Sequence, residues 1–162
     1  MYYKDNDFDG NSKRGGGNYS NNGYADKEIK PVTKFLDEDY VDQAEKVILK
    51  LKNNYKTMVT TTKIRGLLSG MSDIYNDVVR LADNNLPPKI NSKIQYLRVQ
   101  FAYEYGRSLG DNKDKSVKNF IEASHLMDYL QMADGSRDRF IQVERYMEAL
   151  VAYNRYYGGR DE

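Results

Sequence analysis

The segment Lys93–Arg107, KIQYLRVQFAYEYGR, decides the fold class, because it carries two different stripes at the spacing of an α-helix. The apolar stripe consists of Ile94, Leu97, Phe101 and Tyr105. The second stripe, called the Tyr96 row below, consists of Lys93, Tyr96, Gln100, Tyr103 and Arg107. A solvent-facing stripe is normally rich in Glu and Lys, so a row of tyrosines with a cation at each end indicates a contact surface.

The same helical spacing recurs along most of the chain. Helices are expected from Asp37 or Asp39 to Tyr55, from Thr60–Thr62 to Leu81, from Asn91 or Ser92 to Gly106 or Gly110, from about Ser116 to Asp134, and from Ser136 to Tyr157. Prolines and glycines stand between these segments, where helices commonly end. No segment alternates with the period of a strand, so the predicted fold class is all-α, a compact bundle of about five helices.

The first part of the chain has a different composition. Residues 1–30 are rich in Asn, Gly, Asp and Tyr and contain almost no aliphatic side chains, so they cannot bury enough surface to offset the entropy cost of ordering. We therefore expect a disordered N-terminal tail over residues 1–30 and one helical domain over residues 31–162.

The residue inventory is poor in catalytic groups. The chain has no cysteine and one histidine, His125, which argues against thiol chemistry, zinc sites and histidine-based triads. A hydrolase using Glu144, Glu148 or His125 lacks a set that combines nucleophile, base and oxyanion donors. We expect no enzyme activity, cofactor or metal site. No apolar run approaches the roughly 20 residues of a membrane span, so the expectation is a cytoplasmic protein without a membrane partner.

Charge is balanced overall, with a net charge of +1, but it is unevenly distributed. Residues 46–72 and 84–103 contain cations and no acid at all. The cations of these two segments are Lys46, Lys50, Lys52, Lys56, Lys63, Arg65, Lys89, Lys93 and Arg98. Two locally cationic segments inside a neutral protein are compatible with local contacts to an anionic partner.

The junction TTTKIR, residues 60–65, is the most specific of these cationic sites. Lys63 and Arg65 stand in the first turn of a predicted helix, where a positive charge opposes the helix dipole. Unpaired amide groups, a threonine hydroxyl and two cations together predict a phosphate site. The alternative, a capped surface helix with solvated side chains, stays open, and so does the same alternative for Lys52 and Lys56.

The last predicted helix carries a second row of tyrosines, called the Tyr153 row below. It consists of Gln142, Tyr146, Ala149, Tyr153 and Tyr156, with Arg139 and Arg160 in the same register. Tyrosine and arginine are enriched in protein interfaces, so Tyr96, Tyr103, Tyr146, Tyr153 and Tyr156 are predicted interface residues. Packing inside the bundle is the open alternative for both rows.

Three blocks of the sequence carry a resemblance: TTTKIRGLL at 60–68, KIQYLRVQFAYEYGR at 93–107 and YMEALVAYNRYY at 146–157. On these blocks the chain resembles the small subunit of the type III-A CRISPR-associated effector, the Csm complex. The resemblance covers roughly residues 38–158, and the tail does not match. It implies a helical bundle without catalytic activity that stacks head to tail in several copies, beside other subunits of the complex, along guide RNA paired with target RNA.

The resemblance also implies residue roles. Lys63 and Arg65 are expected to be the main contacts to RNA phosphates. Lys52, Lys56, Lys93 and Arg107 are expected to support them, and Arg98 is included although its place on the apolar flank favours a structural role. The competing hypothesis is a protein-only helical adaptor, whose tyrosine rows bind partner helices without RNA.

Overall fold

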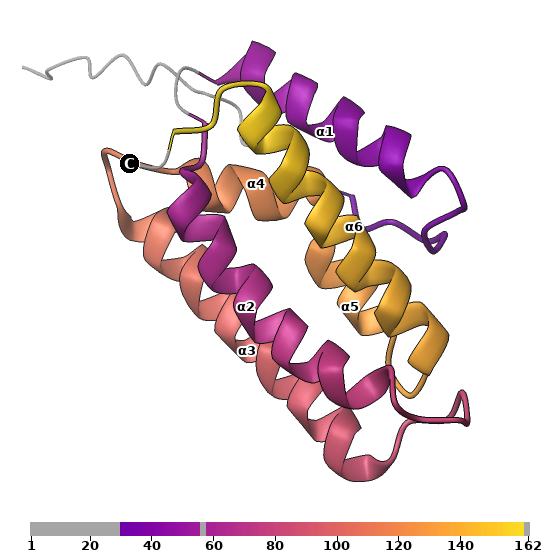
Figure 1. Ribbon diagram of the computed structural model, residues 1–162. Coiled ribbons are helices and arrows are strands. Elements are labelled where there is room, and N and C mark those ends of the chain that lie inside the picture. The colour runs from indigo at the N-terminus through magenta and orange to yellow at the C-terminus, as the bar shows by residue number, and fades with distance from the viewer. Residues whose placement is uncertain (1–29, 56–57, 161–162) are drawn as a thin grey trace, which may run out of the picture.

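The computed structural model describes residues 30–55 and 58–160 (Figure 1). Within these residues six helices form and no strand does, apart from one isolated bridge between Asn85 and Ser136. The helices are α1 (Tyr40–Asn54), α2 (Thr61–Val78), α3 (Pro88–Gly110), α4 (Ser116–Ser124), α5 (Leu126–Met132) and α6 (Arg137–Tyr156). The predicted all-α class is confirmed. The predicted disordered tail lies almost wholly outside the described residues.

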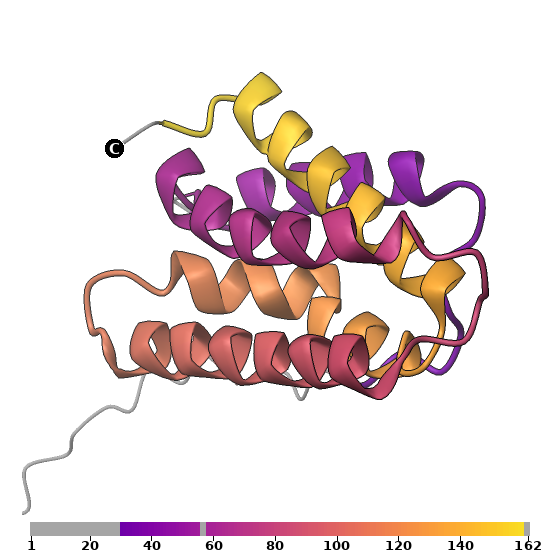
Figure 2. The same cartoon turned by 60° about the horizontal axis from the view of Figure 1, so that its bottom comes forward.

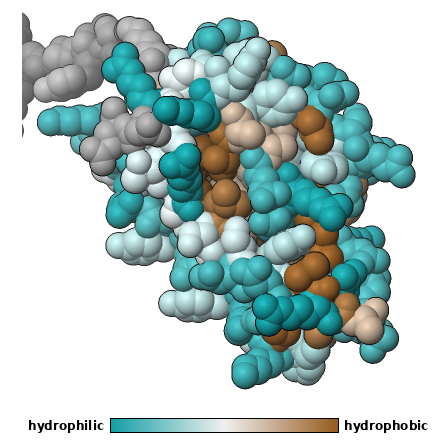
Figure 3. All heavy atoms as spheres, viewed as in Figure 1, coloured by the Kyte–Doolittle hydropathy of each residue, from teal (hydrophilic) through white to brown (hydrophobic). Residues whose placement is uncertain are grey.

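The helices pack around one apolar core. Helix α6 runs between α1 and α2, while α3 packs against α2 on one side and against α4 and α5 on the other (Figures 1 and 2). The largest completely buried side chains come from all six helices: Ile48, Ile64, Met71, Ile94, Phe101, Phe120, Leu126, Leu130, Phe140, Tyr146, Met147 and Leu150. On the face drawn in Figure 3, apolar side chains are visible only in narrow bands between hydrophilic ones.

The predicted fourth helix is two helices, α4 and α5, which makes six where about five were expected. His125 separates them with a left-handed backbone, φ 54°. Its N–H donates to the carbonyl of Glu122 at 3.2 Å, which closes the last turn of α4. An apolar periodicity can continue across such a break because both pieces bury the same side of the chain, so the sequence pattern does not reveal it.

Two helix boundaries also differ from the prediction. Helix α3 begins at Pro88 rather than at Asn91 or Ser92, because proline fits the first helical position, where no N–H is needed. It continues through Gly106, whose Cβ position has no atom within 4 Å, to Gly110. Helix α2 ends at Val78, before the predicted Leu81.

The loop between α2 and α3 is tied to the turn between α5 and α6. The Asn84 carbonyl accepts the N–H of Arg137 at 2.7 Å, and its side-chain oxygen accepts the N–H of Asp138 at 2.9 Å. The N–H of Leu86 donates to the carbonyl of Gly135 at 3.0 Å. These bonds, called the Asn84 clamp below, fix one end of the α2–α3 pair against the start of α6.

Candidate nucleic-acid interface

The first turn of α2 is capped within the protein. The hydroxyl of Thr60 accepts the N–H of Lys63 at 3.4 Å, and the N–H of Thr61 donates to the carbonyl of Arg160 at 2.8 Å. The phosphate site predicted on unpaired amide groups is therefore wrong in that respect, because these two amides already have acceptors. What the TTTKIR junction offers outward is the exposed side chains of Lys63 and Arg65.

Lys63 has an acidic neighbour from a distant part of the chain. Its ammonium group forms an ion pair with Asp114, in the loop between α3 and α4. Asp114 also accepts the N–H of Ser116 at 2.8 Å, at the start of α4. The hydrogen bonds from Lys63 and Ser116 lower the pKa of Asp114 to about 2. Arg65, by contrast, has no ion-pair partner among the described residues.

The Tyr96 row lies on the surface of α3, and all five of its residues are exposed. Tyr96 is 64% exposed and Tyr103 is 66% exposed, and Val99 between them is 60% exposed. A groove of about 680 Å³ runs beside this row, between α3 and α2. Its lining includes Lys63, Ser69, Tyr96, Gln100, Tyr103 and Arg107. The groove thus brings together one cation from the TTTKIR junction and four of the five members of the Tyr96 row.

Small residues on α2 form the opposite wall of the groove. Gly66 has no atom within 4 Å of where a Cβ would stand, whereas the corresponding position on Gly70 lies 3.1 Å from Cδ1 of Leu97. At Gly70 the two helices therefore approach closely, and at Gly66 the surface is open. An elongated polar ligand can reach the backbone of α2 at this open stretch.

Two further cations around the groove are paired with partly exposed carboxylates. Lys93 bonds Asp77 at 2.6 Å across the α2–α3 pair, and Arg107 bonds Glu104 at 2.6 Å within α3. The bond from Lys93 lowers the pKa of Asp77. Exposed ion pairs of this kind contribute little to stability. A phosphate can therefore replace the carboxylate at low cost.

Three other predicted RNA-binding residues lie elsewhere. Lys52 is exposed, with its ammonium 5.4 Å from the ring centre of Tyr157, and Lys56 lies outside the described residues. Arg98 is half-buried and faces α5. Its guanidinium donates to Oε1 of Gln95 at 2.7 Å and to Oε1 of Gln131 at 3.4 Å. This geometry favours the structural role for Arg98, whose guanidinium is held by two side-chain amide oxygens.

The Tyr153 row is only partly exposed. Tyr146 is 0% exposed and its hydroxyl donates to the carbonyl of Ser124 at 3.1 Å, so its predicted interface role is wrong. Burial raises its pKa, as expected for a phenol in the core. Tyr153 is half-buried and stacks on Tyr157 with a centroid distance of 6.2 Å. Tyr156, at 78% exposed, is the member of the row that a partner can reach fully.

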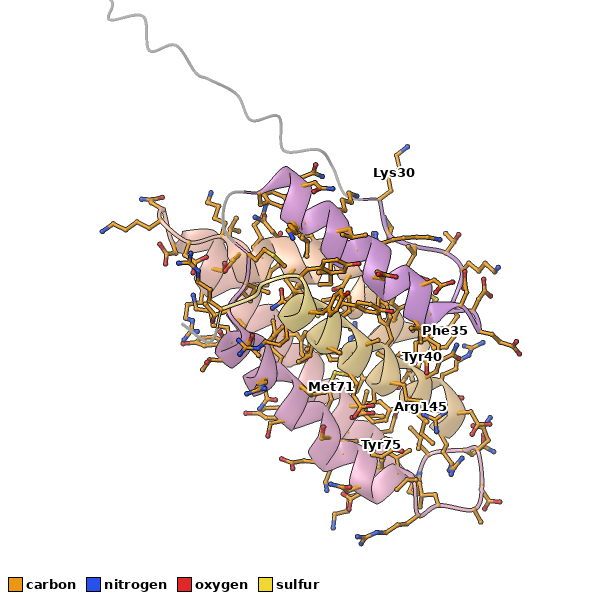
Figure 4. The ribbon with its side chains drawn as sticks, turned by 45° about the horizontal axis from the view of Figure 1, so that its top comes forward. Lys30, Phe35, Tyr40, Met71, Tyr75 and Arg145 are labelled. Carbon is orange, nitrogen blue, oxygen red and sulfur yellow. The ribbon has the colours of Figure 1, made fainter. Side chains whose placement is uncertain are left out.

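A second concavity, of about 490 Å³, lies where α1 begins and α2 ends, beside α6. Tyr40, Tyr75 and Arg145 line it and come from three different helices (Figure 4). Its lining also has two acids, Glu38 and Asp138, so its charge is mixed. It has neither the row of exposed tyrosines nor the cationic balance of the α2–α3 groove.

Of the three groups considered for catalysis, Glu144 and His125 have hydrogen-bond partners within the bundle, and Glu148 is exposed on α6. Glu144 is 2% exposed, and the Ser72 hydroxyl donates to its carboxylate at 3.2 Å. His125 lies 3.3 Å from Asp128 through its Nδ1 atom. Among the described residues, no group of three or more His, Asp or Glu side chains is placed to hold a metal ion. None of the helices in residues 30–55 and 58–160 combines the length and apolar character that crossing a bilayer requires.

Two neighbours of the TTTKIR junction were not among the predicted site residues. Asp114 and Arg160 are separated from Thr61 by 53 and 99 positions, and both reach the first turn of α2 only through the fold. The pair of glycines at 158–159, directly after the predicted end of the last helix, is the sequence signal for a sharp turn that returns the chain to α2.

Comparison with known proteins matches the chain over most of its length. A family model described as Csm2 Type III-A matches residues 34–160. The chain is 36% identical over 129 residues to the CRISPR system Cms protein Csm2 of Mycobacterium tuberculosis, covering 78% of this chain and 98% of that protein. It is 40% identical over 129 residues to the protein of the same name from Streptococcus thermophilus, covering 77% and 96%. A relative from Enterococcus italicus is 33% identical over 102 residues, covering 61% and 68%.

Proposed function

Because the chain belongs to the Csm2 family, the small subunit of the type III-A CRISPR effector complex, we propose that it is a non-catalytic subunit that binds RNA backbone phosphates along a guide–target duplex. Several copies stack head to tail along that duplex, next to other subunits of the complex. Base pairing between the two RNA strands reads the sequence, so this subunit needs only contacts that position the duplex.

The observation that supports this proposal best is the α2–α3 groove. Lys63 and Arg107 line it, Lys93 stands at the end of the same row, and Arg65 projects from the adjoining turn of α2. Lys63, Arg65 and Lys93 come from the two segments that contain no acid in the sequence, Arg107 follows the second of them, and α2 and α3 place these residues on neighbouring helices. Phosphates of one RNA strand can then meet charges from both helices at once.

Binding would exchange one anion for another. Lys63, Lys93 and Arg107 each hold a carboxylate that is partly exposed, and an RNA phosphate takes its place. The released carboxylates return to water. Each cation that gains a phosphate also releases a counterion from the RNA, so the affinity should fall steeply with salt.

Stacking of copies is supported by exposed aromatic side chains. Tyr156 projects from the end of α6, and Tyr96 and Tyr103 flank Val99 on α3. Tyrosine supplies a large contact area at low entropy cost. An interface that joins two different surfaces of identical subunits repeats without closing, which produces an open row of copies.

The test of RNA binding reverses the two main charges. Lys63→Glu with Arg65→Glu should weaken binding of a guide–target RNA duplex, measured by fluorescence anisotropy, by about tenfold or more at low salt. The slope of log affinity against log salt should become smaller by roughly 0.9 per lost contact. Lys46→Glu with Arg145→Glu is the matched control, because it makes the same charge change at exposed positions of α1 and α6, outside the α2–α3 groove.

Unchanged binding by the Lys63/Arg65 variant, with normal helicity, would contradict the assignment. The adaptor hypothesis makes the opposite forecast. A protein that binds partner helices through its tyrosines should show no RNA in a pull-down, and its partner binding should be independent of salt.

A further inference from the structure

We propose that Arg160 is an additional phosphate-binding residue of this interface, held in place by a hook at the end of the described chain, Gly158–Arg160. The inference rests on the proposed function and adds to it a residue that is distant in sequence. It depends on how the hook is attached, on why its shape is fixed and on which charge it presents.

The hook is attached to the first turn of α2 by its backbone. The N–H of Thr61 donates to the carbonyl of Arg160 at 2.8 Å, and the hydroxyl of Thr61 donates to the carbonyl of Gly159 at 3.4 Å. Thr61 is 0% exposed, so these bonds are shielded from water. Because only carbonyl groups of the hook take part, the side chain of residue 160 is not needed for the attachment.

The shape of the hook requires both of its glycines. Gly158 has φ 100°, a conformation that residues with a side chain rarely adopt. A Cβ on Gly159 would lie 2.2 Å from Nδ2 of Asn154 and 2.7 Å from its carbonyl oxygen, too close for any other residue. Asn154 is itself 0% exposed and donates to the carbonyl of Val59 at 3.1 Å, so it has no room to move aside.

Arg155 adds a contact to the same turn. Its guanidinium donates to the carbonyl of Gly159 at 3.3 Å. The hook is therefore held from α6 as well as from α2, and we regard Arg155 as a positioning residue. The path of the chain at residue 160 is therefore determined by Thr61 of α2 and by Asn154 and Arg155 of α6.

Arg160 is exposed and forms no ion pair with another described residue. Its backbone lies at Thr61, one helical turn from Arg65. Lys63 is already paired with Asp114, so Arg65 and Arg160 are the two cations at this junction without a carboxylate partner among the described residues. A guanidinium group can donate two parallel hydrogen bonds to one phosphate, which suits a backbone contact that does not read sequence.

The first experiment measures binding of the full chain to a guide–target RNA duplex by anisotropy at several salt concentrations. Arg160→Ala should weaken binding by about twofold to fivefold, the range for one exposed charged contact, and Arg160→Lys should recover part of the loss. The melting temperature should not change, because the attachment uses the backbone. Arg145→Ala, at an exposed position of α6 beside the second concavity, is the matched control and should bind like the parent.

The second experiment tests proximity in the assembled effector complex. A photo-crosslinking amino acid is placed at position 160, 65 or 145 of separate samples. Cross-links to RNA are expected at 160 and 65 and not at 145, which lies on α6 beside the second concavity. Cross-links at 65 without any at 160, together with parental affinity of Arg160→Ala, would overturn the role of Arg160 and leave the proposed function standing. If neither position 65 nor position 160 cross-links to RNA, both the role of Arg160 and the proposed RNA-binding function would be overturned.

Gly159→Ala tests the position of the hook while keeping the Arg160 side chain in the protein. The clash with Asn154 should displace the hook, so this variant should lose RNA affinity to the same degree as Arg160→Ala and also melt at a lower temperature. A Gly159→Ala protein that melts earlier but binds RNA as tightly as the parent would contradict the positioning role of the hook.

Discussion

Helices α3 and α6 each carry a row of tyrosines, and the two rows lie in different surroundings. Tyr96 and Tyr103 on α3 are 64% and 66% exposed, whereas Tyr146 on α6 is 0% exposed. Helix α6 runs between α1 and α2 and also contacts α5, so most of its circumference is covered. Helix α3 lies at an edge of the bundle and keeps one face uncovered. A tyrosine row therefore indicates a helix face that can be either buried or exposed, and the helices packed around it determine which of the two it becomes.

The largest expected effect is on stability. Tyr146→Ala should reduce the free energy of unfolding by about 3–5 kcal/mol, as for other large aromatic side chains removed from a core. The matched change on α3, Tyr103→Ala, should stay within about 0.5 kcal/mol because the side chain is mostly in water. Urea denaturation of both variants measures the difference. Equal losses in the two proteins would show that the α3 row is packed in solution.

The second effect concerns self-association through the exposed end of α6. Tyr156→Asp should weaken association of copies by about tenfold, since it places a charge in a tyrosine contact. Tyr156→Phe keeps the ring and should associate like the parent. Sedimentation velocity over a concentration series checks this. Identical mass for Tyr156→Asp and the parent at every concentration would exclude this surface.

The third effect is at the edge of the groove. Asp114→Asn removes the carboxylate from Lys63, so RNA affinity should rise by about twofold to threefold while stability at pH 7 falls by up to about 1 kcal/mol after solvent screening. The folded pKa of Asp114 is about 2, below its ordinary value of 3.8, so this stability is present above pH 3.8 and is lost as pH falls through 2. In an acid-unfolding experiment, the variant should not show the loss of stability that protonation of Asp114 causes in the parent.

Asp134→Asn is the control for this prediction. It makes the same charge change in the turn between α5 and α6, where Asp134 accepts a hydrogen bond from Gln95. RNA affinity should be unchanged in this variant. An equal rise in both variants would mean that net charge, rather than release of Lys63, controls binding.

The smallest effect is a pH dependence from the buried face of α6. Burial and the nearby Glu148 raise the pKa of Glu144 above its ordinary value of 4.5. A raised folded pKa means that stability is greatest when the group is protonated and falls as pH rises above 4.5. Glu144→Gln should therefore melt at a higher temperature than the parent at pH 7, and the difference should shrink toward pH 4.5. Glu148→Gln should keep most of the parental pH dependence, because the buried carboxylate remains.

The sequence was sufficient for the fold class, because apolar periodicity marks every long helix. Apolar periodicity does not reveal the break at His125, since α4 and α5 continue one apolar pattern. It also predicts the start of α3 three or four residues too late, because Pro88 opens the helix without belonging to the apolar stripe. Boundaries depend on local capping and backbone geometry, which periodicity does not describe.

The charged and tyrosine residues of the candidate site could be identified from the sequence, but the residues that the fold brings next to them could not. Lys63, Arg107 and the Tyr96 row stand out because they contradict the usual composition of an exposed helix. Tyr146 has the same pattern but is buried, because Tyr129 of α5 and the Ser124 carbonyl at the end of α4 lie against it, and the packing of these helices is a property of the whole bundle. Asp114 and Arg160 reach α2 from far along the chain, so no local pattern could identify them.

The Asn84 clamp has a consequence for the thermodynamics of binding. It fixes α2 and α3 at one end, while Asp114 and the first turn of α2 fix them at the other. A ligand that enters between two helices anchored at both ends finds the binding geometry already formed. Little conformational entropy is then lost on association, so weak single contacts can add up to a useful affinity.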